Sequence, residues 1–234
     1  MNVSSRYRHS LFHWFSPVFI VSLFAAFAGP FQPAMAAEPV ADILVGQFSA
    51  GLLDGWREQV FQGNTLYGFE KSDKRMVLHA TSNNSASGYV FRKPRIKAAS
   101  HPVIRWSWKI KHPILGEDPS RKTGDDYVAR VYVVFPGRFF WQTRALCYVW
   151  SGVMPQGTFR ASPFTANVAN VAVASGTKDA GAWRFEERNY VEDFKRFFGE
   201  EPPDPEAVGI MTDTDNTGTS AEAWYGDISF SPRK

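Results

Sequence analysis

VIRWSWKIK, residues 103–111, alternates between apolar and polar side chains. Its even-numbered positions hold two isoleucines and two tryptophans, and the odd-numbered positions after Val103 are basic or hydroxylated. Successive side chains of an extended chain point to opposite faces, so the tryptophans share one face with the isoleucines. The pattern therefore predicts a half-buried antiparallel strand that carries Trp106 and Trp108 in the core.

The same period of two recurs along the chain, interrupted by clusters of Gly, Pro, Asn and Asp. Residues 127–135 (YVARVYVVF) are apolar on both faces except at Arg130, which is typical of a central strand. Further strands are expected at 43–48, 56–61, 75–81, 88–93, 145–150, 168–174, 207–212 and 223–230. About ten strands with little helix predict an all-β fold, a two-layer antiparallel β-sandwich of the jelly-roll type.

One segment has helical spacing instead. Aromatic residues recur through residues 190–198 as on one face of a helix. Asn189 is a suitable N-cap, Glu192 stands where a capping box requires it, and Gly199 is placed to end the helix. We expect one short helix whose aromatic face packs on the sandwich.

The first 36 residues have the parts of a secretory signal peptide. Arg6 and Arg8 precede an apolar run at 18–28, and the small-x-small site Ala34-Met35-Ala36 follows. The run is about half of the roughly 20 residues that a transmembrane helix needs, although an uncleaved anchor is the alternative. We expect cleavage before Ala37, a single mature domain at 37–234 without a membrane span, and a periplasmic or secreted location.

Charge and cysteine content narrow the function further. Loss of Arg6 and Arg8 lowers the formal net charge from +3 to +1 (3 − 2). A near-neutral chain lacks the concentrated basic face of a nucleic-acid binder, so no nucleic-acid partner is expected. The single cysteine, Cys147, excludes an intrachain disulfide and lies in a strand-like run, where we expect it to be buried.

An acidic loop, DTDNTG at residues 213–218, suggests a metal site. It places oxygen atoms at positions one, three and five and glycine at six, as a calcium loop does. Position twelve is Trp224 instead of glutamate, so this is not an EF-hand. The hypothesis is a looser calcium site made by Asp213, Asp215 and Thr217 and completed by Glu222 or Asp227. The alternative is a polar turn whose side chains bond their own backbone.

Other residues are candidates for ligand binding. Asp126 and Arg130 share one face of the predicted central strand, where they form either a structural pair or a cleft that binds an anion. Phe139, Phe140 and Trp141 follow that strand in an expected loop, and sugar rings stack on exposed aromatic faces. The candidate ligand-binding residues are Asp126, Arg130, Trp141, Trp150 and Tyr225.

The sequence has no G-x-S-x-G, H-E-x-x-H, P-loop or dinucleotide motif. Its acidic residues also do not form the alternating cluster, such as E-x-D-x-x-E, of sandwich-fold glycanases. Catalytic residues are therefore not assigned.

Motifs along nearly the whole mature chain resemble one known family. They are WSWK at 106–109, GDDY at 124–127, RVYVVF at 130–135, YVW at 148–150, Trp183, ERN at 187–189, EDF at 192–194, FGEEPP at 198–203, MTDTDNT at 211–217 and YGDI at 225–228. Together they resemble the bacterial exported family called domain of unknown function 3047. The resemblance implies export, one domain and a β-sandwich, and it assigns no activity. The layout is also similar to the jelly rolls of carbohydrate-binding modules.

Our leading hypothesis is an exported, non-catalytic module that binds a glycan or another envelope component. One alternative is a polysaccharide hydrolase or lyase on the same fold. Another is an envelope protein that binds a protein partner and no small ligand.

Overall fold

The strand with alternating tryptophans lies inside a sheet, as predicted. In the computed structural model, which describes residues 41–233, β6 (Val103–Ile110) lies between β11 (Arg184–Asn189) and β13 (Ser220–Ser231). Its isoleucines and tryptophans at positions 104, 106, 108 and 110 are all buried in the main core cluster. The alternation of polar and apolar residues thus places the core correctly.

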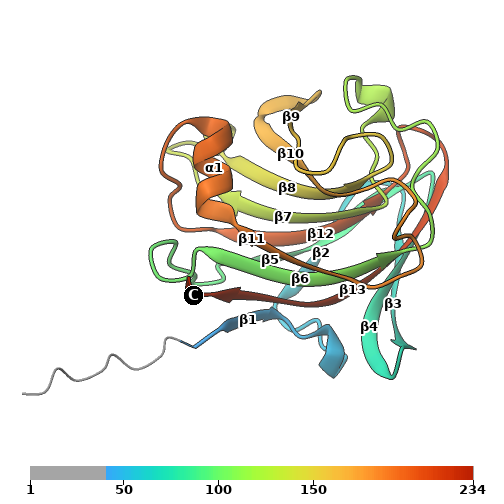
Figure 1. Cartoon of the computed structure of the whole chain (residues 1–234), viewed down its shortest axis with the longest axis horizontal. Helices are drawn as coiled ribbons and strands as arrows, with labels where there is room; N and C mark the ends of the chain where they lie inside the picture. The colour runs from blue at the N-terminus through green and yellow to red at the C-terminus, as the bar shows by residue number, and fades with distance from the viewer. Residues whose placement is uncertain (1–40, 234) are drawn as a thin grey trace, which may run out of the picture. The chain divides into compact units, whose positions relative to one another are not determined.

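The strands of the described chain form two layers (Figure 1). The six-stranded sheet contains β1 (Ile43–Gly46), β3 (Leu66–Ser72), β4 (Arg75–Asn83), β6, β11 and β13. The seven-stranded sheet runs in the order β2 (Trp56–Gln62), β5 (Ala86–Arg92), β12 (Ala207–Asp213), β7 (Ala129–Phe135), β8 (Arg144–Ser151), β10 (Thr165–Ser175) and β9 (Phe159–Ser162). The predicted all-β sandwich is confirmed.

The two sheets meet through large aromatic side chains. The Trp106 ring stacks on Tyr148 of β8, with 5.1 Å between ring centroids, and meets the edge of Trp108 at 5.4 Å. Rings from facing sheets in offset or edge-to-face contact add to the free energy of burial. The tryptophans of β6 therefore pack directly against the opposite sheet.

One strand pair departs from the antiparallel prediction. β8 and β10 pair in parallel, because the chain first passes to the edge strand β9 and then turns back between β9 and β8. Every other strand pair in the described part of the chain is antiparallel.

Each predicted strand has a counterpart, but β3, β9 and β11 were not predicted. β11 is the sequence RFEERN, whose charged side chains hide the period of two. β3 is an edge strand that contains a glycine and exposes Leu66. Charged, glycine-containing or edge strands bury too little surface to show in the sequence.

The predicted helix is α1 (Tyr190–Phe198), which lies beside the ends of β7 and β8 (Figure 1). The Asn189 side chain accepts a hydrogen bond from the Glu192 backbone N–H at 3.1 Å, and Gly199 ends the helix with a φ of 77°. The Glu192 carboxylate bonds Arg233 instead of returning to the cap. Three short 3-10 segments complete the described elements, η1 (Phe48–Ala50), η2 (Lys122–Gly124) and η3 (Phe140–Gln142).

The predicted signal peptide at 1–36 and its cleavage before Ala37 lie outside the described residues. Within residues 41–233, no helix has the length and hydrophobicity that a membrane crossing requires.

Candidate functional site

The outer face of the seven-stranded sheet carries a groove. Residues of β7 alternate, with Val131 and Val133 in the core and Arg130, Tyr132 and Val134 on the opposite, outer face. β12 pairs with β7, and β5 pairs with β12, so the side chains of these two strands also alternate between the core and the outer face.

Two adjoining cavities make up this groove. The apolar cavity has a volume of about 200 Å³ and is floored by β5 and β12. The acidic cavity has a volume of about 360 Å³ and reaches the β9–β10 hairpin. Phe61, Tyr132 and Met211 line both cavities, so we treat the two as one site, the groove.

Glycines keep the apolar cavity open. A side chain at Gly88 would collide with the carbonyl oxygen of Ile210, so this position accepts glycine only. At Gly209 a Cβ would have its nearest neighbour, Tyr132 Cβ, at 3.5 Å, which is ordinary contact. The floor of the groove is bare backbone at Gly88 because the fold requires it, whereas at Gly209 the fold would tolerate a side chain.

A buried ion pair forms the base of the acidic cavity. Arg130 Nε donates to Asp213 Oδ1 at 2.7 Å, and Nη2 donates to Asp213 Oδ2 and to the Asp125 carbonyl. Burial raises the pKa of Asp213 to about 7, and the guanidinium charge of Arg130 offsets only part of this increase. The sequence suggested that Arg130 pairs with Asp126 or binds an anionic ligand. The structure corrects this, because the guanidinium is already bound by Asp213.

Asp126 holds a loop instead of facing the groove. Its carboxylate accepts hydrogen bonds from the backbone and side chain of Asn216 at 3.3 and 3.0 Å. It also accepts hydrogen bonds from the backbone N–H and the hydroxyl group of Thr217 at 2.6 and 2.7 Å. Asp126 is fully buried, so it fixes residues 214–218 and is not itself in the cavity lining.

The predicted calcium ligands come together only in part. Carboxylate oxygens of Asp126, Asp213 and Asp215 lie within 4.8 Å of one another. All three carboxylates accept hydrogen bonds from the protein, Asp126 and Asp213 several each and Asp215 one from Asn216. Calcium takes six to eight oxygen ligands, and these oxygens are largely engaged already. Glu222 is not part of this cluster, because it pairs with Lys111 at 2.6 Å on the six-stranded sheet. The geometry favours the polar turn over the calcium loop.

Asp125 lines the acidic cavity next to the β9–β10 hairpin. It accepts hydrogen bonds from Asn170 Nδ2 at 3.1 Å and from Ser162 Oγ at 3.2 Å. Asn170 Oδ1 is buried and has no hydrogen-bond partner within residues 41–233. An unpartnered acceptor therefore lies behind this part of the wall.

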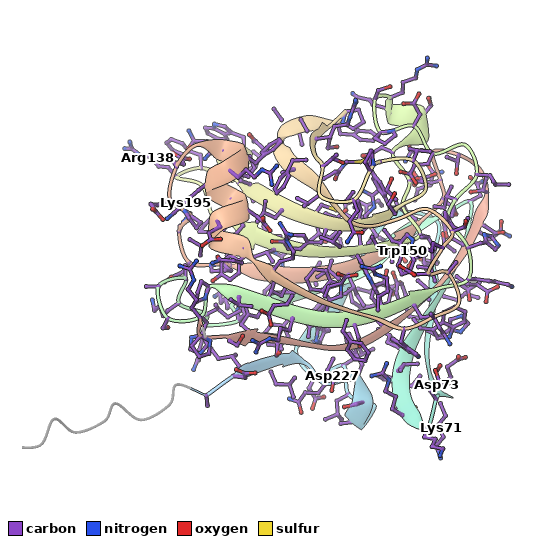
Figure 2. The ribbon with its side chains drawn as sticks, in the orientation of Figure 1. Lys71, Asp73, Arg138, Trp150, Lys195 and Asp227 are labelled. Carbon is purple, nitrogen blue, oxygen red and sulfur yellow. The ribbon has the colours of Figure 1, made fainter. Side chains whose placement is uncertain are left out.

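The proposed aromatic platform separates into core and surface residues. Trp150 is buried among the strands (Figure 2), and Tyr225 donates to the Met211 carbonyl at 2.6 Å from within the core. These two candidate ligand-binding residues are therefore corrected, because both rings are buried. Trp141 is exposed, stacks on Phe139 at 4.7 Å, and lies in the loop that begins with Arg138 at the edge of the domain (Figure 2). This loop lines a separate cavity beside α1.

The groove contains aromatic residues that sequence reasoning missed. Phe61 and Phe164 line the acidic cavity with 69% and 53% of their surface exposed. Phe164 follows Pro163 in a hairpin turn, and a lone aromatic in a polar turn was the available signal. Phe61 lies at an irregularity of β2, where the period of two is broken. Cys147, as predicted, is buried, and burial raises its pKa to about 12.

Fold and site together define a β-sandwich domain with a ligand-sized groove on the outer face of one sheet. The chain belongs to the family described as Protein of unknown function (DUF3047), whose family model matches residues 54–229. The resemblance drawn from the sequence motifs is confirmed. No curated protein matches the sequence.

The solved structures with a similar fold include carbohydrate-binding modules and glycoside hydrolases. The Family 11 carbohydrate-binding module of the cellulase Lic26A-Cel5E of Clostridium thermocellum has 11% identity and a TM-score of 0.46, over 83% of this chain and 96% of that one. Endoglucanase Cel12A of Rhodothermus marinus has 12% identity and a TM-score of 0.44, over 83% and 100%. The CBM22-2 xylan-binding domain of Xyn10C from Paenibacillus barcinonensis has 11% identity and a TM-score of 0.41, over 80% and 98%. These similarities concern the fold alone.

Proposed function

We propose that this protein is an exported, non-catalytic module that binds a glycan in the groove of the seven-stranded sheet. The observation that carries the proposal is the exposure of Phe61 and Phe164 on the lining of the acidic cavity. A large apolar ring gains free energy from burial, so two exposed rings beside one cavity indicate a contact surface. The flat face of each ring suits the apolar face of a sugar.

The polar groups beside these rings suit sugar hydroxyls. Asp215 and Asn216 line the same cavity and offer carboxylate and amide groups. Ligand sites of about 300–1,000 Å³ commonly combine an apolar lining with a few polar groups that fix orientation. The acidic cavity has this composition and, at about 360 Å³, this size.

Binding fits the carboxylates better than hydrolysis does. A glycosidase needs two carboxyl groups that are free to exchange protons or attack the sugar. Asp213 is held by Arg130, and Asp125 by Asn170 and Ser162. Of the acids that line the groove, only Asp215 has a single weak donor, the side chain of Asn216 at 3.3 Å.

Export is part of the proposal. A signal peptide at 1–36 would deliver residues 37–234 to the periplasm or the exterior, where the glycans of the envelope and its surroundings are found.

The test is a glycan array probed with purified residues 37–234, followed by titration calorimetry of each glycan that binds. Phe61→Ala and Phe164→Ala are each expected to weaken the affinity by about tenfold or more, because they remove a ring that stacks on the ligand.

The matched control is Phe185→Ala. Phe185 is 72% exposed but lies on β11 of the other sheet, so the affinity should stay within about twofold. Unchanged affinity in both groove variants, or no glycan bound at all, would contradict the proposal. Release of product from a bound glycan would instead favour the hydrolase or lyase.

A further inference from the structure

Negative charge exceeds positive charge on the lining of the acidic cavity. Asp125, Asp213 and Asp215 line it, and Arg130 is the one basic residue in that lining. The guanidinium of Arg130 is bound to Asp213, and within residues 41–233 neither Asp125 nor Asp215 forms a salt bridge. One further cation, Lys122, lies beside the lining, with its Nζ 5.3 Å from the centroid of the Phe164 ring. The carboxylate of a fourth acid, Asp126, has an oxygen within 4.8 Å of those of Asp213 and Asp215.

A buried acceptor without a partner lies behind the lining. Asn170 is fully buried, donates its Nδ2 to Asp125, and keeps an unpartnered Oδ1 within the described chain. It projects from the same face of β10 as Val168, which lines the cavity. Buried polar atoms are nearly always hydrogen-bonded, and this carbonyl oxygen, beside the Asp125 carboxylate, adds to the negative potential of the wall without contacting a ligand itself.

Asp215 is the accessible acid of the group. It is half-buried, and burial together with the nearby Asp126 charge raises its pKa. Both effects disfavour the ionised carboxylate, and a positive charge beside it would reverse them.

We infer that the acidic cavity prefers a sugar with a free ammonium group, a hexosamine unit without its N-acetyl group, to neutral or uronate sugars. This inference rests on the proposed glycan binding. An ammonium group has three donors and no acceptor, which complements the carboxylates of Asp125 and Asp215 on the lining. A uronate would place another carboxylate beside those of the cavity, which opposes binding.

The test compares three oligosaccharides of equal length by titration calorimetry with the mature chain. They are β-1,4-linked glucosamine, its N-acetylated form, and galacturonate. Glucosamine is expected to bind about tenfold more tightly than the N-acetylated form, and galacturonate more weakly than both. The preference should shrink at high salt, because exposed charges are then screened.

Asp215→Asn supplies the residue-level test. It removes the accessible charge and should abolish most of the preference for glucosamine while binding of the N-acetylated form persists. The control is Asp73→Asn at the tip of the β3–β4 hairpin (Figure 2), where the backbone φ of 49° suits asparagine. This variant should keep the preference, and equal melting temperatures would show that both variants fold.

The outcomes separate the inference from the proposed function. Equal affinity for the two glucosamine forms, or a preference that survives in Asp215→Asn, overturns the inference and leaves glycan binding intact. Absence of binding to any glycan overturns both. A tetralysine peptide that binds as tightly as glucosamine would show recognition of ammonium without a sugar, and this too would overturn the inference.

Discussion

On the six-stranded sheet, the outward-facing charged and aromatic side chains bind one another. The Trp224 ring lies between Lys109, whose Nζ is 4.5 Å from the ring centroid, and His79, which stacks on it at 4.8 Å. His79 in turn lies 3.2 Å from Glu70 and 3.6 Å from Glu222. The charges of this row have partners within the same face.

The groove face of the seven-stranded sheet is built differently. Within residues 41–233, Phe61 and Phe164 pair with no other aromatic ring, although Lys122 Nζ lies 5.3 Å from the Phe164 centroid. The Asp215 carboxylate on the same lining accepts one hydrogen bond, from Asn216 at 3.3 Å. Surface aromatics and charges are common on both sheets, so their number does not distinguish the faces. What distinguishes the groove is that its groups are left to be satisfied by a ligand.

The largest expected difference concerns the ion pairs of the two faces. Arg130→Met leaves the carboxylate of Asp213, which is 2% exposed, buried without its partner. We expect the free energy of unfolding to fall by about 3–5 kcal/mol. Arg105→Met breaks the pair with Glu187 on the six-stranded sheet. The Glu187 side chain is 61% exposed, so the free energy of unfolding should fall by less than about 1 kcal/mol. Urea denaturation measures both, and equal losses would remove this distinction between the faces.

A second prediction fills the groove without touching its charges. Gly209→Val places a branched side chain on the floor of the apolar cavity, where the backbone has room for a Cβ. Affinity for the bound glycan should fall by more than about tenfold, while stability changes by less than about 1 kcal/mol.

Gly68→Val is the matched change on the other sheet. Gly68 lies in β3 and pairs with His79 of β4, and a Cβ at Gly68 would meet no atom within 4 Å. The affinity should be unaffected, and a comparable loss in both variants would contradict binding in the groove.

The smallest expected effect is a pH dependence. Burial and Asp126 raise the pKa of Asp215 in the folded protein, so between the ordinary aspartate pKa of about 3.9 and the raised value the folded state binds more protons than the unfolded state. Stability from this group is therefore present at low pH and is lost as pH rises through that window. Asp215→Asn should lose less stability over the window than the wild type, measured by urea denaturation at a series of pH values. A steeper loss in the variant would reverse the assigned direction.

Local patterns predicted much of the fold. The alternation in β6 and the caps of α1 depend on residues near one another in the chain, and both were predicted correctly. The parallel pairing of β8 with β10 was not, because it depends on where the chain places β9. Arg130 and Asp213 are 83 positions apart, and nothing local in the sequence joins them.

The candidate site was harder to predict for a related reason. Asp125 and Asp126 are adjacent, yet one lines the cavity and the other anchors a loop. Trp150 lies in a strand that is apolar on both faces, so the pattern did not show which face of β8 was the core. Residues of extended chains that differ by one position differ in face, and aromatic content alone does not specify the face.

The hydrogen bonds that hold the walls of the acidic cavity affect the entropy of ligand binding. A single guanidinium, that of Arg130, joins the Asp213 carboxylate to the backbone of Asp125, while Asn170 and Ser162 fix the Asp125 side chain. Those walls are ordered before a ligand arrives, so most of the conformational entropy lost on binding is that of the ligand. Such a preorganised site should favour glycans that are already stiff in the bound shape over flexible ones with the same chemical groups.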